Sequence, residues 1–373
     1  MSENNLRVLS IFGTRPEAVK MAPVVQELKN HKNIESIVCV TAQHREMLDQ
    51  VLNLFAIRVD YDLDLMQHDQ TLASLTASVF TGLDPVLRES RADWILVQGD
   101  TTTVMAASLL AYYHRINVGH VEAGLRTSDK WQPFPEEINR RVASTVADLH
   151  FAPTEWASDN LLSEGVPREQ IVITGNPVID ALQQVIEQPY DLASGPLQGI
   201  PDNKRIILVT AHRRENFGEP MRRIFSALRN IAQSYAHDVV LIYPVHLNPN
   251  VHGLAHEILG DVENIRLLEP LNYLPMVHLM ARAHIVLTDS GGLQEEAPAL
   301  GTPVLVLRDV TERPEAIEAG TARLVGTDFD RIIEQTQLLL EDSEEYATMA
   351  KAINPFGDGQ AATRIVDAVL ANA

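Results

Sequence analysis

Short runs of β-branched and apolar residues alternate along the chain with longer stretches in which apolar residues recur every three or four positions. This alternation predicts an α/β fold in which parallel sheets are covered by helices on both faces. The predicted strands form two series. The first is Val8–Phe12, Ile37–Thr41, Trp94–Gln98, Val118–Glu122, Leu149–Pro153 and Ile171–Thr174. The second is Ile206–Thr210, Val239–Pro244, Ile265–Leu268, Ile285–Thr288, Pro303–Leu307 and Arg323–Gly326.

A segment rich in Gly, Pro and polar residues separates the two series and is typical of a linker. We predict a Rossmann-like domain over 1–187, a linker over 188–203 and a second Rossmann-like domain over 204–355. Residues 356–373 are expected to form a helix that could pack back on the first domain. Two such domains facing each other would leave a deep cleft at the carboxyl ends of their strands, where open α/β sheets bind ligands.

The composition is that of a globular protein with an acidic surface. The 373-residue chain is 45% hydrophobic and carries a formal net charge of −20. Such a surface repels polyanions, so we expect no binding to nucleic acid or membranes, and an anionic ligand would need a local cationic pocket. A single cysteine, Cys39, excludes an intramolecular disulfide. With neither a signal-peptide pattern nor an apolar stretch near the ~20 residues of a membrane span, we expect a cytoplasmic protein.

Two strand-to-helix turns could bind an anion. After the first strand, Gly13 permits a tight turn, and Arg15 would lie beside the free N–H groups of a helix N-terminus. The alternative is a plain turn with a solvated arginine. Neither a G-x-G-x-x-G nor a Walker sequence is present, which removes the usual argument for nicotinamide chemistry or ATP hydrolysis.

The second turn follows the predicted strand Ile285–Thr288. Ser290 could donate a hydroxyl there, and the paired glycines Gly291 and Gly292 would let a phosphate approach the backbone closely. Glu296, one helical turn further on, could accept both hydroxyls of a ribose. Arg313 could bring a second cation to the same place.

Acidic residues at strand ends are the strongest candidates for catalysis. Asp100 and Glu122 end consecutive predicted strands, and Glu136 follows shortly afterwards. Carboxylates placed together raise one another's proton affinity, which suits general acid and base roles at neutral pH. The alternative is structural: Asp100 would cap the helix that starts near Thr102, and Glu122 would pair with Arg126.

Cations gather at two strand ends of the second domain. His212 and Arg213 close its first predicted strand and His246 follows the next. On a protein of this net charge, the cluster favours a diphosphate clamp over a solvated surface. The histidines show no metal-ligand spacing, so we predict no metal.

Taken together, these segments resemble the non-hydrolysing UDP-N-acetylglucosamine 2-epimerases of bacteria. The resemblance extends from residue 7 to Gly359, with the motifs in family order. The matching segments are Phe12–Ala18, Thr41–Gln50, Gly99–Thr103, Gly119–Thr127, His212–Asn216, Asp289–Pro298 and Thr311–Glu315.

The resemblance implies two Rossmann-like domains as in GT-B glycosyltransferases, a homodimer, and no cofactor. The implied reaction interconverts UDP-N-acetylglucosamine and UDP-N-acetylmannosamine by elimination and re-addition of UDP through a 2-acetamidoglucal, and it supplies N-acetylmannosamine for surface polysaccharide. Asp100, Glu122, Glu136 and His212 would be the catalytic residues. The residues implied to bind UDP are Arg15, Lys20, His212, Leu271, Met276, Ser290, Gly291, Gly292, Glu296 and Arg313.

A second substrate molecule could act as an activator, and Gln43, Arg213 and His246 match that regulatory site. Other functions remain open at this point. A hydrolysing 2-epimerase would release N-acetylmannosamine and UDP. A GT-B-type glycosyltransferase would use the same UDP pocket with an acceptor, and a binding-only sensor would show affinity without turnover.

Overall fold

The computed structural model describes residues 5–41, 45–65, 70–127 and 129–373. The chain divides into two compact units: unit 1 is residues 1–183 with 356–373, and unit 2 is residues 184–355. The division falls inside helix α7 (Pro177–Ile186) rather than at residue 187. The segment 188–203, expected as a linker, lies within unit 2, where Leu197 is fully buried.

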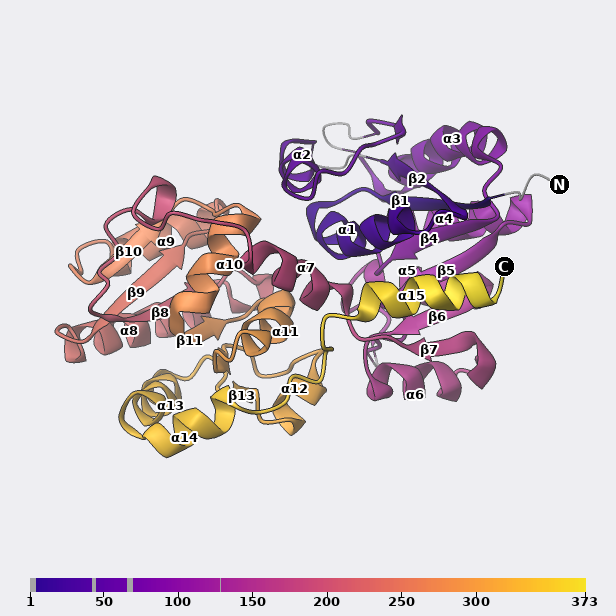
Figure 1. The fold of residues 1–373 in the computed structure, drawn as a ribbon. Coiled ribbons are helices and arrows are strands. Elements are labelled where there is room, and N and C mark those ends of the chain that lie inside the picture. The colour runs from indigo at the N-terminus through magenta and orange to yellow at the C-terminus, as the bar shows by residue number, and fades with distance from the viewer. Residues whose placement is uncertain (1–4, 42–44, 66–69, 128) are drawn as a thin grey trace. The chain divides into compact units, whose positions relative to one another are not determined.

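Unit 1 is built on a parallel sheet of seven strands among the described residues, in the order β3-β2-β1-β4-β5-β6-β7 (Figure 1). The strands are β1 Leu6–Phe12, β2 Ile34–Val40, β3 Tyr61–Asp62, β4 Trp94–Gln98, β5 Asn117–Val121, β6 Leu149–Ala152 and β7 Ile171–Ile173. The remaining helices are α1 Arg15–Asn30, α2 Arg45–Leu54, α3 Leu72–Ser90, α4 Thr102–His114, α5 Glu136–Val146, α6 Glu155–Ser163 and α15 Ala361–Ala371.

Both faces of this sheet are covered. Leu9 and Ile11 of β1 are buried in one core cluster with residues of α3, α4 and α5. Because side chains alternate along a strand, Val8 and Ser10 point to the other face. Helix α1 packs there with α2 and α15, so the helix at 361–371 completes unit 1 (Figure 1).

Unit 2 repeats the architecture with a parallel sheet of six strands within its described residues, in the order β10-β9-β8-β11-β12-β13. These strands are β8 Arg205–Thr210, β9 Val239–Pro244, β10 Ile265–Leu268, β11 Ala283–Thr288, β12 Val304–Val306 and β13 Ala322–Leu324. The helices are α8 Glu219–Ser234, α9 Pro249–Leu259, α10 Tyr273–Arg282, α11 Gly291–Ala299, α12 Pro314–Glu318, α13 Phe329–Glu341 and α14 Ser343–Ala350.

The predicted α/β class is confirmed, and each predicted strand coincides with an observed one to within a few residues. The prediction missed β3. Two residues are too few to show a period-two pattern, and this strand exists only because it pairs with Cys39 and Val40 of β2. In both sheets the strand order reverses at the first strand of the unit, the position at which open α/β sheets bind ligands.

Candidate active site

Asp100 and Glu122 lie at the carboxyl ends of β4 and β5, which are hydrogen-bonded neighbours in the sheet. Gly99 joins the two strand ends, because its N–H donates to the carbonyl of Val121 at 3.0 Å. Its φ of 81° is in the left-handed region, and a Cβ there would lie 3.5 Å from a carboxylate oxygen of Glu122. The structure therefore brings the two strand-end carboxylates to one edge of the sheet, as the sequence predicted.

The Glu122 carboxylate is buried, with 5% of its side chain exposed. The Lys20 ammonium lies 2.5 Å from its Oε1, and the side-chain amide of Asn176 donates to the same oxygen at 2.9 Å. The amide of Gln98 donates to Oε2. These donors stabilise the carboxylate as an anion. The Glu122 backbone has a φ of 61°, a strained conformation for a non-glycine residue of the kind that clusters at functional sites.

Asp100 is more accessible, with 32% of its side chain exposed. The Arg140 guanidinium donates to its Oδ2 at 2.5 Å, and the amide of Asn139 donates to its backbone carbonyl at 2.9 Å. Both partners lie on α5. Asp100 is thus held by a helix whose first residue is another predicted site residue, Glu136, which is half-buried.

The structural alternatives for these carboxylates are wrong. Thr101, not Asp100, caps α4, because the Thr101 hydroxyl accepts from the N–H of Val104. Arg126, expected as the partner of Glu122, instead makes a two-armed ion pair with Glu164 at 2.7 and 2.9 Å.

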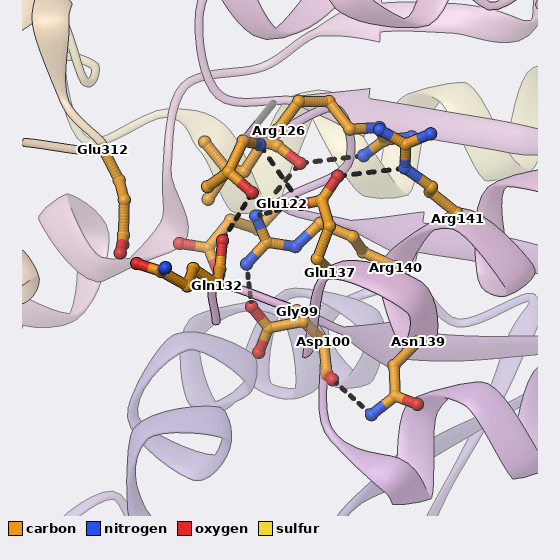
Figure 2. A network of polar contacts seen from close by, with 12 residues as sticks. Gly99, Asp100, Glu122, Arg126, Gln132, Glu137, Asn139, Arg140, Arg141 and Glu312 are labelled. Carbon is orange, nitrogen blue, oxygen red and sulfur yellow. Dashed lines mark hydrogen bonds and ion pairs between the residues drawn. The ribbon is translucent and has the colours of Figure 1, made fainter. Parts of the chain in front are cut away.

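Glu137 was not singled out by the sequence, yet its carboxylate is fully buried and is the centre of a network of ion pairs (Figure 2). It accepts from Nε of Arg141 at 2.9 Å and from the N–H of Thr127 at 3.2 Å, and it lies 3.4 Å from Nη1 of Arg140. The sequence shows two consecutive acids at 136 and 137. Which of the two carboxylates is buried depends on the residue at which α5 begins, and the sequence does not specify that residue.

The first strand-to-helix turn differs from the expectation. Thr14 caps α1 and forms a capping box with Glu17, whose carboxylate accepts from the N–H groups of Gly13 at 3.0 Å and Thr14 at 2.7 Å. Those two N–H groups, expected to be free for an anion, are therefore occupied by a side chain of the same turn. Burial raises the pKa of Glu17, against the lowering effect of its hydrogen bonds. Arg15 is half-buried at the first position of α1.

In unit 2, Ser290 is the N-cap of α11, and its side chain makes no capping hydrogen bond. Gly291 and Gly292 form the first turn of this helix. A Cβ on Gly291 would lie only 3.3 Å from the guanidinium carbon of Arg313, so the arginine packs closely against this glycine. The structure thus places a buried arginine directly against a glycine-rich helix N-terminus, an arrangement that attracts anions.

Carboxylates surround this arginine. Nε of Arg313 donates to Glu295 at 2.7 Å, and Nη1 donates to Glu312 at 3.1 Å. Glu296, the predicted ribose ligand, accepts a hydrogen bond from the hydroxyl of Tyr273 at 2.6 Å. Sequence reasoning missed Glu295 and Tyr273, since neither pairing leaves a signal in the local pattern.

The cationic turn after β8 is organised by a buried aspartate that the sequence did not assign. Oδ2 of Asp289 accepts from the N–H groups of His212 at 2.7 Å and Arg213 at 2.8 Å. The His212 ring lies 5.2 Å from the ring of His246. Burial lowers the pKa of His212 although Asp289 opposes this, so the ring is held mainly neutral near pH 7. Because β8 and β11 are neighbours in the sheet, their ends lie side by side. That adjacency is the signal from which the pairing of Asp289 with the turn at His212 could have been predicted.

The remaining predicted residues are divided between described and undescribed parts of the chain. Leu271 is buried and Met276 is half-buried, one before the start of α10 and one within its first turn. Arg213 and His246 of the predicted regulatory site lie in the cationic cluster, whereas Gln43 lies outside the described residues.

Neither a metal cluster nor a membrane helix was found in the described part of the chain. No group of three or more His, Cys, Asp or Glu side chains there could hold a metal ion. No helix in the same ranges has the length and apolar character needed to cross a membrane.

Comparison with known proteins gives a consistent result. A family model described as UDP-N-acetylglucosamine 2-epimerase matches residues 26–370. The UDP-N-acetylglucosamine 2-epimerase of Escherichia coli strain K12 is 54% identical over 375 residues, covering 98% of this chain and 99% of the relative. The UDP-N-acetylglucosamine 2-epimerase of Bacillus subtilis strain 168 is 52% identical over 365 residues, covering 98% of this chain and 95% of the relative. The chain belongs to the UDP-N-acetylglucosamine 2-epimerase family.

Solved structures agree. The UDP-GlcNAc 2-epimerase of Neisseria meningitidis, bound to UDP-GlcNAc, is similar with a TM-score of 0.91 and 50% identity, over 98% of this chain and 100% of that one. The UDP-GlcNAc 2-epimerase of Methanocaldococcus jannaschii, in complex with UDP-GlcNAc and UDP, is similar with a TM-score of 0.82 and 31% identity, over 99% of this chain and 100% of that one. A Streptomyces nogalater glycosyltransferase shares the fold alone, with a TM-score of 0.60 and 16% identity. The predicted family, the GT-B-like fold and the assignment as an isomerase are confirmed.

Proposed function

We propose that the protein interconverts UDP-N-acetylglucosamine and UDP-N-acetylmannosamine by elimination and re-addition of UDP, without hydrolysis. The observation that carries this proposal is the pair of strand-end carboxylates in unit 1, Asp100 and Glu122, each paired with its own cation. Inversion at C2 needs one group to remove a proton and another to return one to the opposite face. Two differently placed carboxylates meet that requirement.

In the first half of the reaction, a carboxylate takes the C2 proton while the bond between C1 and the diphosphate oxygen breaks. UDP leaves with the electron pair of that bond, and a C1–C2 double bond forms in the 2-acetamidoglucal. Re-addition reverses these steps with protonation from the other face of C2. Glu122, Asp100 and Glu136 are the proposed proton-transfer groups, and Glu122 is stabilised as an anion by Lys20.

UDP must be retained while the glucal exists, because its release would leave no nucleotide to add back, and addition of water to the glucal would then give a free sugar. Unit 2 supplies the groups for this in the N-terminus of α11, Arg313 and the turn at His212. We propose that Glu296, Leu271 and Met276 bind the nucleoside, and that Arg15 and Lys20 of unit 1 support the diphosphate. Two relatives solved with UDP-GlcNAc support the substrate assignment.

The wider role is also proposed. The protein would act in the cytoplasm as a homodimer. Its product would supply N-acetylmannosamine units for surface polysaccharide. A second substrate molecule would activate it through Gln43, Arg213 and His246.

Deuterium exchange tests the reaction. Incubation of the enzyme with UDP-N-acetylglucosamine in deuterated water is expected to yield both epimers carrying one deuterium at C2, seen by mass spectrometry and NMR. Recovered sugar nucleotides without C2 deuterium would refute the proposal. Stoichiometric accumulation of free N-acetylmannosamine and UDP would instead identify a hydrolysing enzyme, and release of UDP that depends on an acceptor would identify a glycosyltransferase.

A further inference from the structure

Among the residues that the structure describes, the Asp100 carboxylate forms an ion pair with one buried cation, Arg140. Nη2 of Arg140 donates to Oδ2 of Asp100 at 2.5 Å, and Nη1 of the same guanidinium donates to the carbonyl of Leu125 at 3.2 Å (Figure 2). Only 7% of the Arg140 side chain is exposed, compared with 32% for Asp100. The arginine is therefore a fixed, buried support for a carboxylate that is open to solvent.

Arg140 is itself held in place by a charge. Nη1 lies 3.4 Å from the fully buried carboxylate of Glu137, one turn earlier on α5. Glu137 also accepts from the N–H of Thr127, which ties the helix to the preceding loop. Movement of the guanidinium away from Glu137 would remove one of the two arginines that neutralise this buried carboxylate, which carries a cost.

From these contacts we infer that Arg140 is a positioning residue of the active site: with Glu137 behind it, its guanidinium fixes the direction in which the Asp100 carboxylate faces C2 of the substrate. This inference rests on the proposed function. An arginine suits the task because its planar fork contacts two acceptors, Asp100 and Leu125, whereas a lysine ammonium is a point charge without that geometry. The role is indirect, since Arg140 acts through Asp100.

The neighbouring residue provides a matched control. Arg141 also pairs with Glu137, through Nε at 2.9 Å, and so its loss removes the same kind of ion pair from the same helix. Its side chain is 47% exposed, and it makes no hydrogen bond or ion pair with Asp100 among the described residues. A comparison of the two arginines therefore separates support of Asp100 from general support of α5.

The experiment compares the full-length wild type with Arg140→Met, Arg140→Lys and Arg141→Met. Each is measured for kcat and KM with UDP-N-acetylglucosamine, for UDP affinity by calorimetry, and for thermal unfolding. Because a misplacement of about 1 Å can cost about a hundredfold in rate, Arg140→Met is expected to lower kcat by about a hundredfold. Arg140→Lys, which keeps the charge but not the fork, is expected to recover part of this and remain about tenfold below wild type.

Changes in KM and UDP affinity are expected to stay within about threefold for all variants, since unit 2 holds the nucleotide in the proposed function. Arg141→Met is expected to keep kcat within about threefold of the wild type. Near-normal kcat in Arg140→Met overturns the inference, as does an equal loss in Arg140→Met and Arg141→Met with equal loss of thermal stability. If Arg140→Met does not fold, Arg140→Lys decides alone, and its full activity overturns the inference.

The wild type separates this inference from the proposed function. A wild type without C2 exchange in deuterated water overturns both. A wild type that exchanges at C2, together with an unimpaired Arg140→Met, overturns only the role of Arg140.

Discussion

The two units have closely similar sheets but use charge in opposite ways. At the strand ends of unit 1, cations hold carboxylates in place: Lys20 pairs with Glu122, and the buried Arg140 pairs with Asp100. In unit 2 the order is reversed, because the buried Asp289 supports the cationic turn at His212, and Glu295 supports Arg313. The same fold can therefore present acids at the strand ends of one unit and cations at those of the other.

This difference divides the proposed reaction between the units. Groups that exchange protons belong to unit 1, and groups that hold an anion belong to unit 2. Arg213 fits the second role, since its Nε is buried without a hydrogen-bond partner within the described residues. Substitutions in unit 1 should consequently lower kcat and those in unit 2 should weaken UDP binding, and the first two predictions below test that separation.

The largest effect is expected in unit 1. Asp100→Asn or Glu122→Gln should lower kcat by about a thousandfold, because an amide keeps the shape of the carboxylate but cannot exchange its proton. UDP affinity, measured by calorimetry, should change little. Glu164→Gln, which removes an acid bound to Arg126 in the same unit, serves as the control and should retain turnover. Near-normal turnover in both test variants would reduce Asp100 and Glu122 to structural residues.

A smaller effect is expected in unit 2. Arg313→Ala should weaken UDP binding by about thirtyfold, equivalent to about 2 kcal/mol, since a charge-assisted contact is lost and Glu295 is left buried without it. The measurement is calorimetric titration with UDP, accompanied by thermal unfolding. Arg222→Ala, at an exposed ion pair with Glu257, controls for the loss of one positive charge. Unchanged UDP affinity would remove Arg313 from the nucleotide site.

The third prediction concerns stability rather than activity. Burial lowers the pKa of His120 to about 3, although its hydrogen bond to the carbonyl of Gly99 opposes the shift. The unfolded chain therefore binds a proton below pH 6.5 that the folded unit does not, so stability falls as the pH falls through this range. Between pH 6.5 and pH 5 the expected loss from this residue is about 2 kcal/mol.

Urea unfolding at the two pH values, followed for the wild type and His120→Gln, measures this loss. The variant keeps a side-chain donor for Gly99 but does not titrate, so its stability should depend less on pH by the stated amount. The same pH dependence in both proteins would show that the buried imidazole is not its source.

Local pattern was enough to predict much of the fold. The β-branched runs located the strands, and consecutive strands such as β4 and β5 are usually neighbours, so the approach of Asp100 to Glu122 followed. The spacing of Thr14 and Glu17 is also that of a capping box, although the sequence analysis predicts an anion site at this turn. The carboxylate of Glu17, in the first turn of α1, turns back and accepts from the backbone N–H groups that an anion would need.

Partners distant in sequence could not be predicted. The pairing of Lys20 with Glu122 joins residues 102 positions apart, and that of Asp289 with His212 joins residues 77 apart. Such contacts depend on where helices settle against the sheet, which a single sequence does not specify. Glu137 shows the same limit over a shorter range, because its complete burial follows from the loop that packs over α5.

The place of α15 bears on how the molecule is made. Its first N–H groups donate to the carboxylate of Asp180, at 3.2 Å from Ala361 and 2.9 Å from Ala362, and its apolar side chains Ile365, Val366 and Val369 are fully buried. A ribosome must translate all of unit 2 before it delivers this helix to α1. During synthesis, the carboxylates proposed to be catalytic consequently wait in a half-finished unit 1 until unit 2 has emerged.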